Sequence, residues 1–195
     1  MDIESDTALE HRWSWWTNEL NSPENPKGVP HFLGTIGSVF EFWAWYDSFP
    51  KPSEYFNGKG SPWTIPAVTK AVITGLSFFK EGISPTWEDR GNVGGYTYRI
   101  IIPPIITKTF LDELALEPFL VSIGNEYLVY IDDTDYNFSD YITGIRLFDR
   151  RGRGAMVEVW FCRETPNPET FANVVLQKMQ ALISMPLTIS LVDRT

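Results

Sequence analysis

The segment YITGIRLFDRRGRGAMVEVWFC, residues 141–162, predicts a β-hairpin and with it an antiparallel sheet. Its two arms, residues 141–149 and 156–162, are rich in the β-branched and aromatic side chains that favour strands. Between them, Gly152 and Gly154 supply a turn that tolerates positive φ angles. Strands joined by so short a connection run in opposite directions, so we expect the neighbouring strands to be antiparallel as well.

Five other segments have strand composition and are bounded by turn-forming residues. They cover residues 13–17, 31–36, 71–79, 96–102 and 187–192. We predict that 71–79 and 96–102 pair with each other as antiparallel neighbours. Trp87 would then lie in the loop at the connecting end of this pair.

Three helices are predicted from their capping residues. A capping box that begins at Ser38 opens the first helix, residues 39–48, and the second spans residues 109–124. Asn167 caps the third helix, which has proline at its first position and spans residues 168–184.

These elements predict an α+β fold in a single domain over residues 1–195. The strands form a curved, mostly antiparallel sheet, three helices pack on its convex face, and the concave face is left for a ligand slot. A long connection rich in proline and glycine, about residues 49–66, joins the first helix to the next strand.

Composition narrows the possible functions. The net charge of −9 argues against binding along a nucleic-acid backbone, which needs a broad cationic surface. The exception is a local patch formed by Arg146 and the three arginines of the turn; its alternative interpretation is a solvated hairpin tip. The single cysteine, Cys162, and the acidic N-terminus predict a cytoplasmic protein. The longest apolar run, residues 100–106, is too short to cross a membrane.

Residues 85–89, Pro-Thr-Trp-Glu-Asp, place an indole and a carboxylate side by side in a predicted loop. The carboxylate of Glu88 can accept from N1 and N2 of guanine, while the indole of Trp87 attracts a positively charged ring. A guanine methylated at N7 carries that charge. The alternative is a core tryptophan beside a solvated acid.

The chain resembles the eukaryotic translation initiation factor 4E family, whose members bind the 7-methylguanosine cap of messenger RNA. The resemblance spans most of the chain. It rests on Arg12-Trp13-x-x-Trp16, Val39-x-x-Phe42-Trp43-Ala44-x-Tyr46, Phe79-Lys80-Glu81-Gly82-Ile83-x-Pro85-x-Trp87-Glu88-Asp89, Gly94-Gly95 and Trp160.

The resemblance implies a cap site. In it Trp87 stacks on the methylated base, Glu88 accepts from its N–H groups, and Trp160 contacts the N7 methyl group. Phosphate contacts are implied for Arg150, Arg151 and Arg153, with the exact register of the turn left open.

A second stacking aromatic is expected near Pro26, where this sequence has none. His31, Phe32 and Trp63 are the alternatives, and none is assigned. The missing aromatic and the long connection resemble divergent paralogues of trypanosomatid protozoa.

The resemblance also implies a dock for an amphipathic helix of a scaffold or repressor protein. The implied dock residues are Val39, Trp43, Leu116, Glu117 and Leu120. Ordinary packing between helices is the alternative for these leucines.

We therefore expect a monomeric initiation factor that binds capped messenger RNA and recruits a scaffold protein. The alternatives are a translational repressor and an interaction module with weak or no cap binding. An enzyme is not expected, because His11 and His31 lie near no nucleophile signature. Residues 133–144 imitate a calcium loop but lack its glycine and final glutamate, so we expect an acidic loop and neither metal nor cofactor.

Overall fold

A computed structural model describes residues 6–20, 29–55, 72–106, 108–124, 127–150 and 153–192. The elements in chain order are β1 (Ala8–Leu20), β2 (Val29–Ser38), α1 (Val39–Ser48), α2 (Pro52–Tyr55), β3 (Val72–Lys80), β4 (Tyr96–Ile102), α3 (Lys108–Ile123), β5 (Leu128–Ile131), β6 (Thr134–Asn137), α4 (Phe138–Tyr141), β7 (Ile142–Asp149), β8 (Ala155–Phe161), α5 (Pro168–Gln180) and β9 (Thr188–Leu191).

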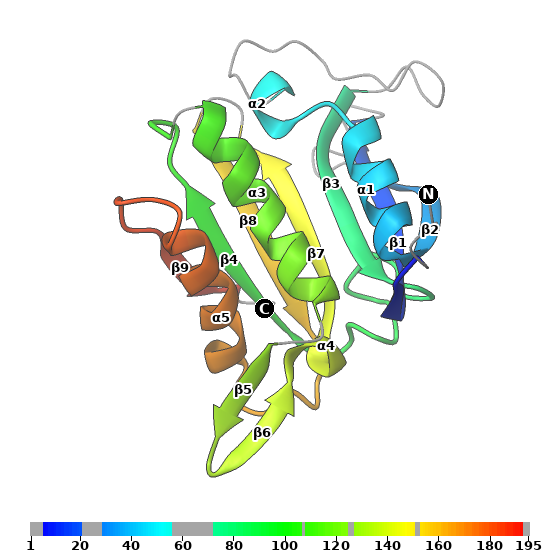
Figure 1. The fold of residues 1–195 in the computed structure, drawn as a ribbon, viewed down its shortest axis with the longest axis vertical. Coiled ribbons are helices and arrows are strands. Elements are labelled where there is room, and N and C mark those ends of the chain that lie inside the picture. The colour runs from blue at the N-terminus through cyan, green and yellow to red at the C-terminus, as the bar shows by residue number, and fades with distance from the viewer. Residues whose placement is uncertain are drawn as a thin grey trace.

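Seven strands form one curved sheet in the order β2-β1-β3-β7-β8-β4-β9. Every pair of neighbours within it is antiparallel, and β7 and β8 form the hairpin predicted from residues 141–162. The three long helices α1, α3 and α5 lie on one side of this sheet (Figure 1). The predicted α+β architecture is confirmed.

The predicted pairing of residues 71–79 with 96–102 is wrong. β3 pairs with β1 and β7, while β4 pairs with β8 and β9, so the β7–β8 hairpin lies between β3 and β4. The two segments follow one another in the sequence, which suggested that they pair. In the sheet, β3 instead has β7 as its apolar neighbour, and β4 has β8. The loop over residues 81–95 therefore spans two strands instead of closing a hairpin.

The first helix begins where its capping box predicts. The N–H of Glu41 donates to Ser38 Oγ at 3.2 Å, and the Glu41 carboxylate reaches back to the N–H of Gly37 at 2.6 Å. Asn167 caps α5, although that helix ends at Gln180, before the predicted end at residue 184. The Leu187 N–H donates to the Gln180 side chain at 2.7 Å, which turns the chain toward β9.

An aromatic core joins the helices to the sheet. The ring of Trp15 is fully buried and lies 4.4 Å from Phe78 and 5.2 Å from Phe119, measured between centroids. Trp13 stacks on Phe78 at 4.8 Å. Burial of such large rings stabilises the contact between sheet and helices, and it fixes which sheet face remains open to ligands.

The acidic loop expected over residues 133–144 is wrong. Residues 133–137 belong to a β5–β6 hairpin, which projects from the end of the sheet, the next four residues form the short helix α4, and residues 142–144 begin β7 (Figure 1). Asp132 and Asp133 have positive φ angles of 49° and 60° and form the turn, a conformation that aspartate tolerates better than most residues. Of the long connection predicted over residues 49–66, α2 belongs to the described chain, and residues 56–66 lie outside the described residues.

Candidate functional site

The sheet face opposite the helices carries a row of side chains around Trp160. The register aligns Trp160 with Gly144 and Thr97, and Gly144 with Phe79. The rings of Phe79 and Trp160 meet edge to face at 5.4 Å. A Cβ atom on residue 144 would collide with the Phe79 ring, so glycine is required at that position.

Trp87 lies on top of this row. Its ring stacks on Trp160 with 3.8 Å between centroids and 22° between planes, and Trp160 is fully buried beneath it. Trp87 itself is partly exposed. The structure therefore brings together the two tryptophans that the resemblance placed at the base site.

Two polar side chains brace the loop that carries Trp87. Asp89 accepts from the N–H groups of Ser84 and Gly91, each at 2.9 Å. The Asn92 amide donates to the carbonyl groups of Ser84 and Thr86 at 2.8 Å, and its oxygen accepts from Thr143 on β7 at 2.9 Å. These bonds fix the position of residues 84–92 above the sheet and so the place of Trp87.

Glu88 is exposed beside Trp87. No hydrogen bond or ion pair joins its carboxylate to another side chain in the described part of the chain. Both carboxylate oxygens can therefore accept hydrogen bonds from a ligand held against Trp87.

A second row, next to the Trp160 row, holds a charged network. The sequence analysis grouped Arg146 with the arginines of the turn and missed Arg99 and Glu158. Glu158 is 5% exposed; it accepts from Arg99 at 2.9 Å and lies 3.7 Å from Arg146. Arg146 also donates to Asn18 Oδ1 at 3.1 Å, and its guanidinium lies over the rings of Phe148 and Trp160 at 4.4 and 5.5 Å. The alternation of side chains along each strand could have predicted part of this network. Residues two apart lie on the same sheet face, so Glu158 shares a face with Trp160, and Arg146 shares a face with Gly144.

The arginine turn lies farther from the tryptophans. Ala155, where β8 begins, is five residues from Trp160, about 17 Å along an extended strand. Within the turn, Arg150 and Arg153 each donate to the other's carbonyl oxygen, at 3.2 and 3.4 Å. Arg151 lies outside the described residues.

The candidates for a second stacking aromatic are placed as follows. Phe32 on β2 is half-exposed and meets Trp16 edge to face at 5.1 Å. Four strand spacings separate β2 from β8, about 19 Å, so Phe32 does not reach the Trp87–Trp160 stack. His31 is an exposed neighbour of Phe32, while Trp63 and Pro26 lie outside the described residues.

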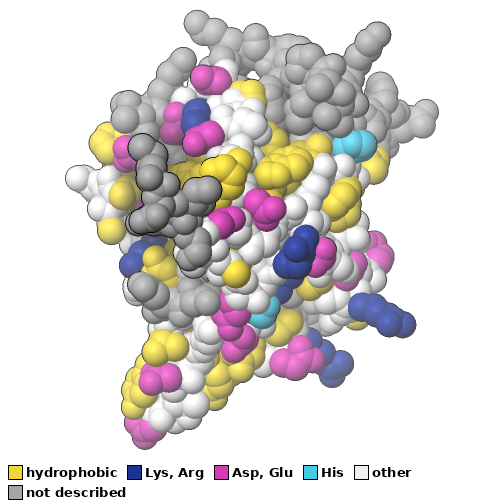
Figure 2. Space-filling view, turned by 45° about the vertical axis from the view of Figure 1, so that its right-hand side comes forward, with side chains coloured by type: hydrophobic (Ala, Val, Ile, Leu, Met, Phe, Trp, Pro, Cys, Tyr) yellow, Lys and Arg dark blue, Asp and Glu magenta, His cyan; other side chains and the backbone are white. Residues whose placement is uncertain are grey.

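The predicted dock is on the helical side of the molecule. Val39 and Trp43 on α1 are 36% and 38% exposed, and Trp43 contacts Phe42 and Tyr46 edge to face. On α3, Leu116, Glu117 and Leu120 are partly buried, and burial raises the pKa of Glu117 against the opposing charge of Lys178. Figure 2 shows hydrophobic side chains gathered in the upper half of the side that carries α1.

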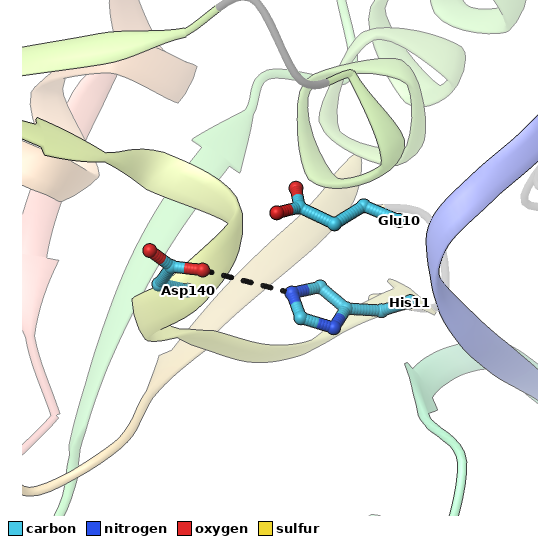
Figure 3. Close-up of side chains that lie close together, drawn as sticks. All are labelled: Glu10, His11 and Asp140. Atoms are coloured by element: carbon cyan, nitrogen blue, oxygen red, sulfur yellow. Dashed lines mark ion pairs between the residues drawn. The ribbon is translucent and has the colours of Figure 1, made fainter.

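Glu10, His11 and Asp140 form a separate cluster, in which ligand atoms lie within 4.8 Å of one another (Figure 3). His11 Nε2 is 3.8 Å from Asp140 Oδ1, and Glu10 accepts from Ser139 Oγ at 2.6 Å. Lys80 donates to the Asp140 carbonyl at 3.3 Å. Its charge opposes a metal cation there, so we interpret the cluster as a structural link between β1 and α4.

The pKa of His11 is lowered, first by burial and then by the charge of Lys80. His11 therefore binds a proton more readily in the unfolded chain than in the folded one. The stability that neutral His11 contributes is fully present above the pKa that this histidine has in the unfolded chain, and it is lost as the pH falls below that pKa. We expect the unfolding temperature to drop less between about pH 7.5 and pH 5.5 in His11→Gln than in the wild type. His31→Gln, at an exposed position, is the control, and an equal drop in all three proteins would contradict the prediction.

Taken together, an antiparallel sheet backed by three long helices, with paired tryptophans on its open face, defines a protein of the initiation factor 4E class. The family model described as eukaryotic initiation factor 4E matches residues 8–191. The chain belongs to the eukaryotic initiation factor 4E family. The family is one of initiation factors, so the expectation that the protein is not an enzyme is confirmed.

Three similar proteins illustrate the relation. Eukaryotic translation initiation factor 4E-5 of Caenorhabditis elegans is 26% identical over 180 residues, which cover 90% of this chain and 77% of the relative. C. elegans eIF4E-3, in complex with the 4E-binding protein Mextli, superposes with a TM-score of 0.68 at 22% identity, covering 95% and 93% of the two chains. Ascaris suum eIF4E-3, in complex with an m2,2,7G cap, gives 0.68 at 21% identity, covering 97% and 93%. The two structures establish the shared fold.

The narrower resemblance to trypanosomatid paralogues stays a prediction. Among the described helices, none has the length and apolar character needed to cross a membrane.

Proposed function

We propose that this protein binds the 7-methylguanosine cap of messenger RNA at Trp87, Glu88 and Trp160, and recruits a scaffold protein through α1 and α3 as a cytoplasmic initiation factor. The observation that carries the proposal is the stack of Trp87 on Trp160 beside the exposed Glu88. The cap complex of the Ascaris relative supports it, because that protein has the same fold.

The chemistry of this group favours a methylated guanine. Methylation at N7 makes the base cationic, and a cation over an indole face gains about 0.5–2 kcal/mol. The Glu88 carboxylate can accept from N1–H and the exocyclic amine together, and these charge-assisted bonds are stronger than neutral ones. Unmethylated guanine offers the same N–H groups but lacks the positive charge, so it should bind more weakly.

Retention on 7-methyl-GTP resin tests the proposal. We expect the protein to bind and to elute with free 7-methyl-GTP but not with GTP at the same concentration. Elution by both nucleotides alike would show that the methyl group is not read, and a failure to bind would leave the interaction-module alternative as the better description.

That alternative, a 4E-like protein that acts only through its partner surface, has one observation in its favour. Trp87 already covers Trp160, and the sequence near Pro26 supplies no aromatic to hold the far side of a base. A repressor would use the same two surfaces as an initiation factor and differ only in the protein it recruits.

The arginine turn is proposed to contact the outer phosphates or the nucleotides that follow the cap. Replacing Arg150, Arg151 and Arg153 together by alanine should weaken 7-methyl-GTP binding by about threefold to tenfold, because three exposed charges near the low end of the usual range contribute about 0.6–1.4 kcal/mol together. Binding of 7-methylguanosine, which has no phosphates, should not change. The salt dependence measured by fluorescence titration should flatten, whereas equal losses for both ligands would indicate a folding defect.

A further inference from the structure

The charge balance behind Trp160 is unusual for a surface that should receive phosphates. Arg99 and Arg146 are the cations of the second row, and both are joined to one buried carboxylate, Glu158. Glu158 also accepts from the Trp160 indole N–H at 3.4 Å. The carboxylate therefore lies beside Trp160, in the row next to the proposed base site.

The two arginines are held in place, and each has one buried donor atom that is unpaired within the described part of the chain. Arg146 is fixed by Asn18 Oδ1 and by the Phe148 ring, and Arg99 by Glu158 Oε1. The Nε atoms of both are buried and have no hydrogen-bond partner among the described residues. Two guanidinium groups and one carboxylate leave the cluster with a net charge of about +1, so a phosphate must compete with Glu158 for them.

We propose that Glu158 is a specificity-determining residue, which reduces the affinity that phosphates add and makes the site select mainly for the methylated base. The inference rests on the proposed cap-binding function. Glu158 acts in two ways: it occupies the arginine donors, and its charge repels a phosphate while attracting the cationic base held against Trp87. In a buried cluster this repulsion is weakly screened by solvent.

The environment of Arg146 agrees with this role. Burial lowers the pKa of its guanidinium, and the charge of Glu158 opposes that effect. Glu158 thus stabilises a buried cation that would otherwise need an external anion. Its removal should make a bound phosphate the replacement counter-ion.

The test compares 7-methylguanosine, 7-methyl-GMP and 7-methyl-GTP by calorimetric titration. The quantity compared is the dissociation constant of 7-methylguanosine divided by that of 7-methyl-GTP. In the wild type this ratio should be small, because the phosphates add little affinity. In Glu158→Gln that ratio should rise by about tenfold or more, as expected for charge-assisted hydrogen bonds freed for the ligand. Glu113→Gln, which removes an exposed carboxylate on α3 at the other face of the sheet, should leave the ratio unchanged.

Glu158→Gln leaves two buried guanidinium groups without a counter-ion and can lose stability for that reason. The double variant Glu158→Gln/Arg99→Gln keeps the cluster near its original net charge while freeing Arg146, and its ratio should also rise. An unchanged ratio in a folded variant would overturn the inference, as would an equal loss of all three ligands. If the wild type binds none of them, the proposed function fails, whereas a wild type with a large ratio that Glu158→Gln does not alter refutes only the role of Glu158.

Discussion

Glu88→Gln should reduce the affinity for 7-methyl-GTP by about 30- to 700-fold, the equivalent of about 2–4 kcal/mol for removing one partner of a desolvated charged hydrogen-bonded pair. The amide cannot accept hydrogen bonds from both N–H groups of the base, because one of its two terminal atoms is a donor. It also carries no negative charge to attract the methylated, cationic ring. Glu88 is exposed, so the change should leave the unfolding temperature close to that of the wild type.

Tryptophan fluorescence measures this affinity, because Trp87 belongs to the proposed site. The matched control is Glu113→Gln, which makes the same chemical change on α3 and should bind as the wild type does. A Glu88→Gln variant that retains its affinity would exclude this carboxylate from base recognition.

Trp43→Ala should weaken binding of an amphipathic scaffold-derived peptide by about 30-fold or more, corresponding to about 2 kcal/mol for an interface hot spot. The indole is 38% exposed on α1 at helical spacing from Val39, so it is available as an anchor. The sheet separates α1 from Trp87 and Trp160. Affinity for 7-methyl-GTP should therefore stay within about twofold of the wild type, since distant sites act almost independently.

Part of the Trp43 ring packs on Phe42 and Tyr46, so the variant should also unfold at a somewhat lower temperature. Tyr130→Ala, which removes an exposed aromatic from the β5–β6 hairpin, is the control and should bind the peptide normally. If Trp43→Ala loses peptide and cap binding together, Trp43 belongs to the core and the dock must be sought elsewhere.

The proposed site is divided between residues that the sequence could suggest and residues that it could not. Trp87 and Glu88 are adjacent in the chain, and Trp160 follows a recognisable hairpin, so local pattern and resemblance were enough to select them as candidates. Arg99, Arg146 and Glu158 meet only because β4, β7 and β8 pair in one register. A shift of one residue in either ladder would turn these side chains to the helical face.

The sequence by itself determined the elements whose signals are local. The capping box at Ser38 set the start of α1, and the glycine-rich turn set the β7–β8 hairpin, because each depends on hydrogen bonds and φ angles within a few residues. Only the tertiary structure decided that this hairpin lies between β3 and β4, and that residues 128–137 pair as β5 and β6. Strand pairing joins residues far apart in the chain, and its free energy depends on the side chains that each sheet face buries, which no local window contains.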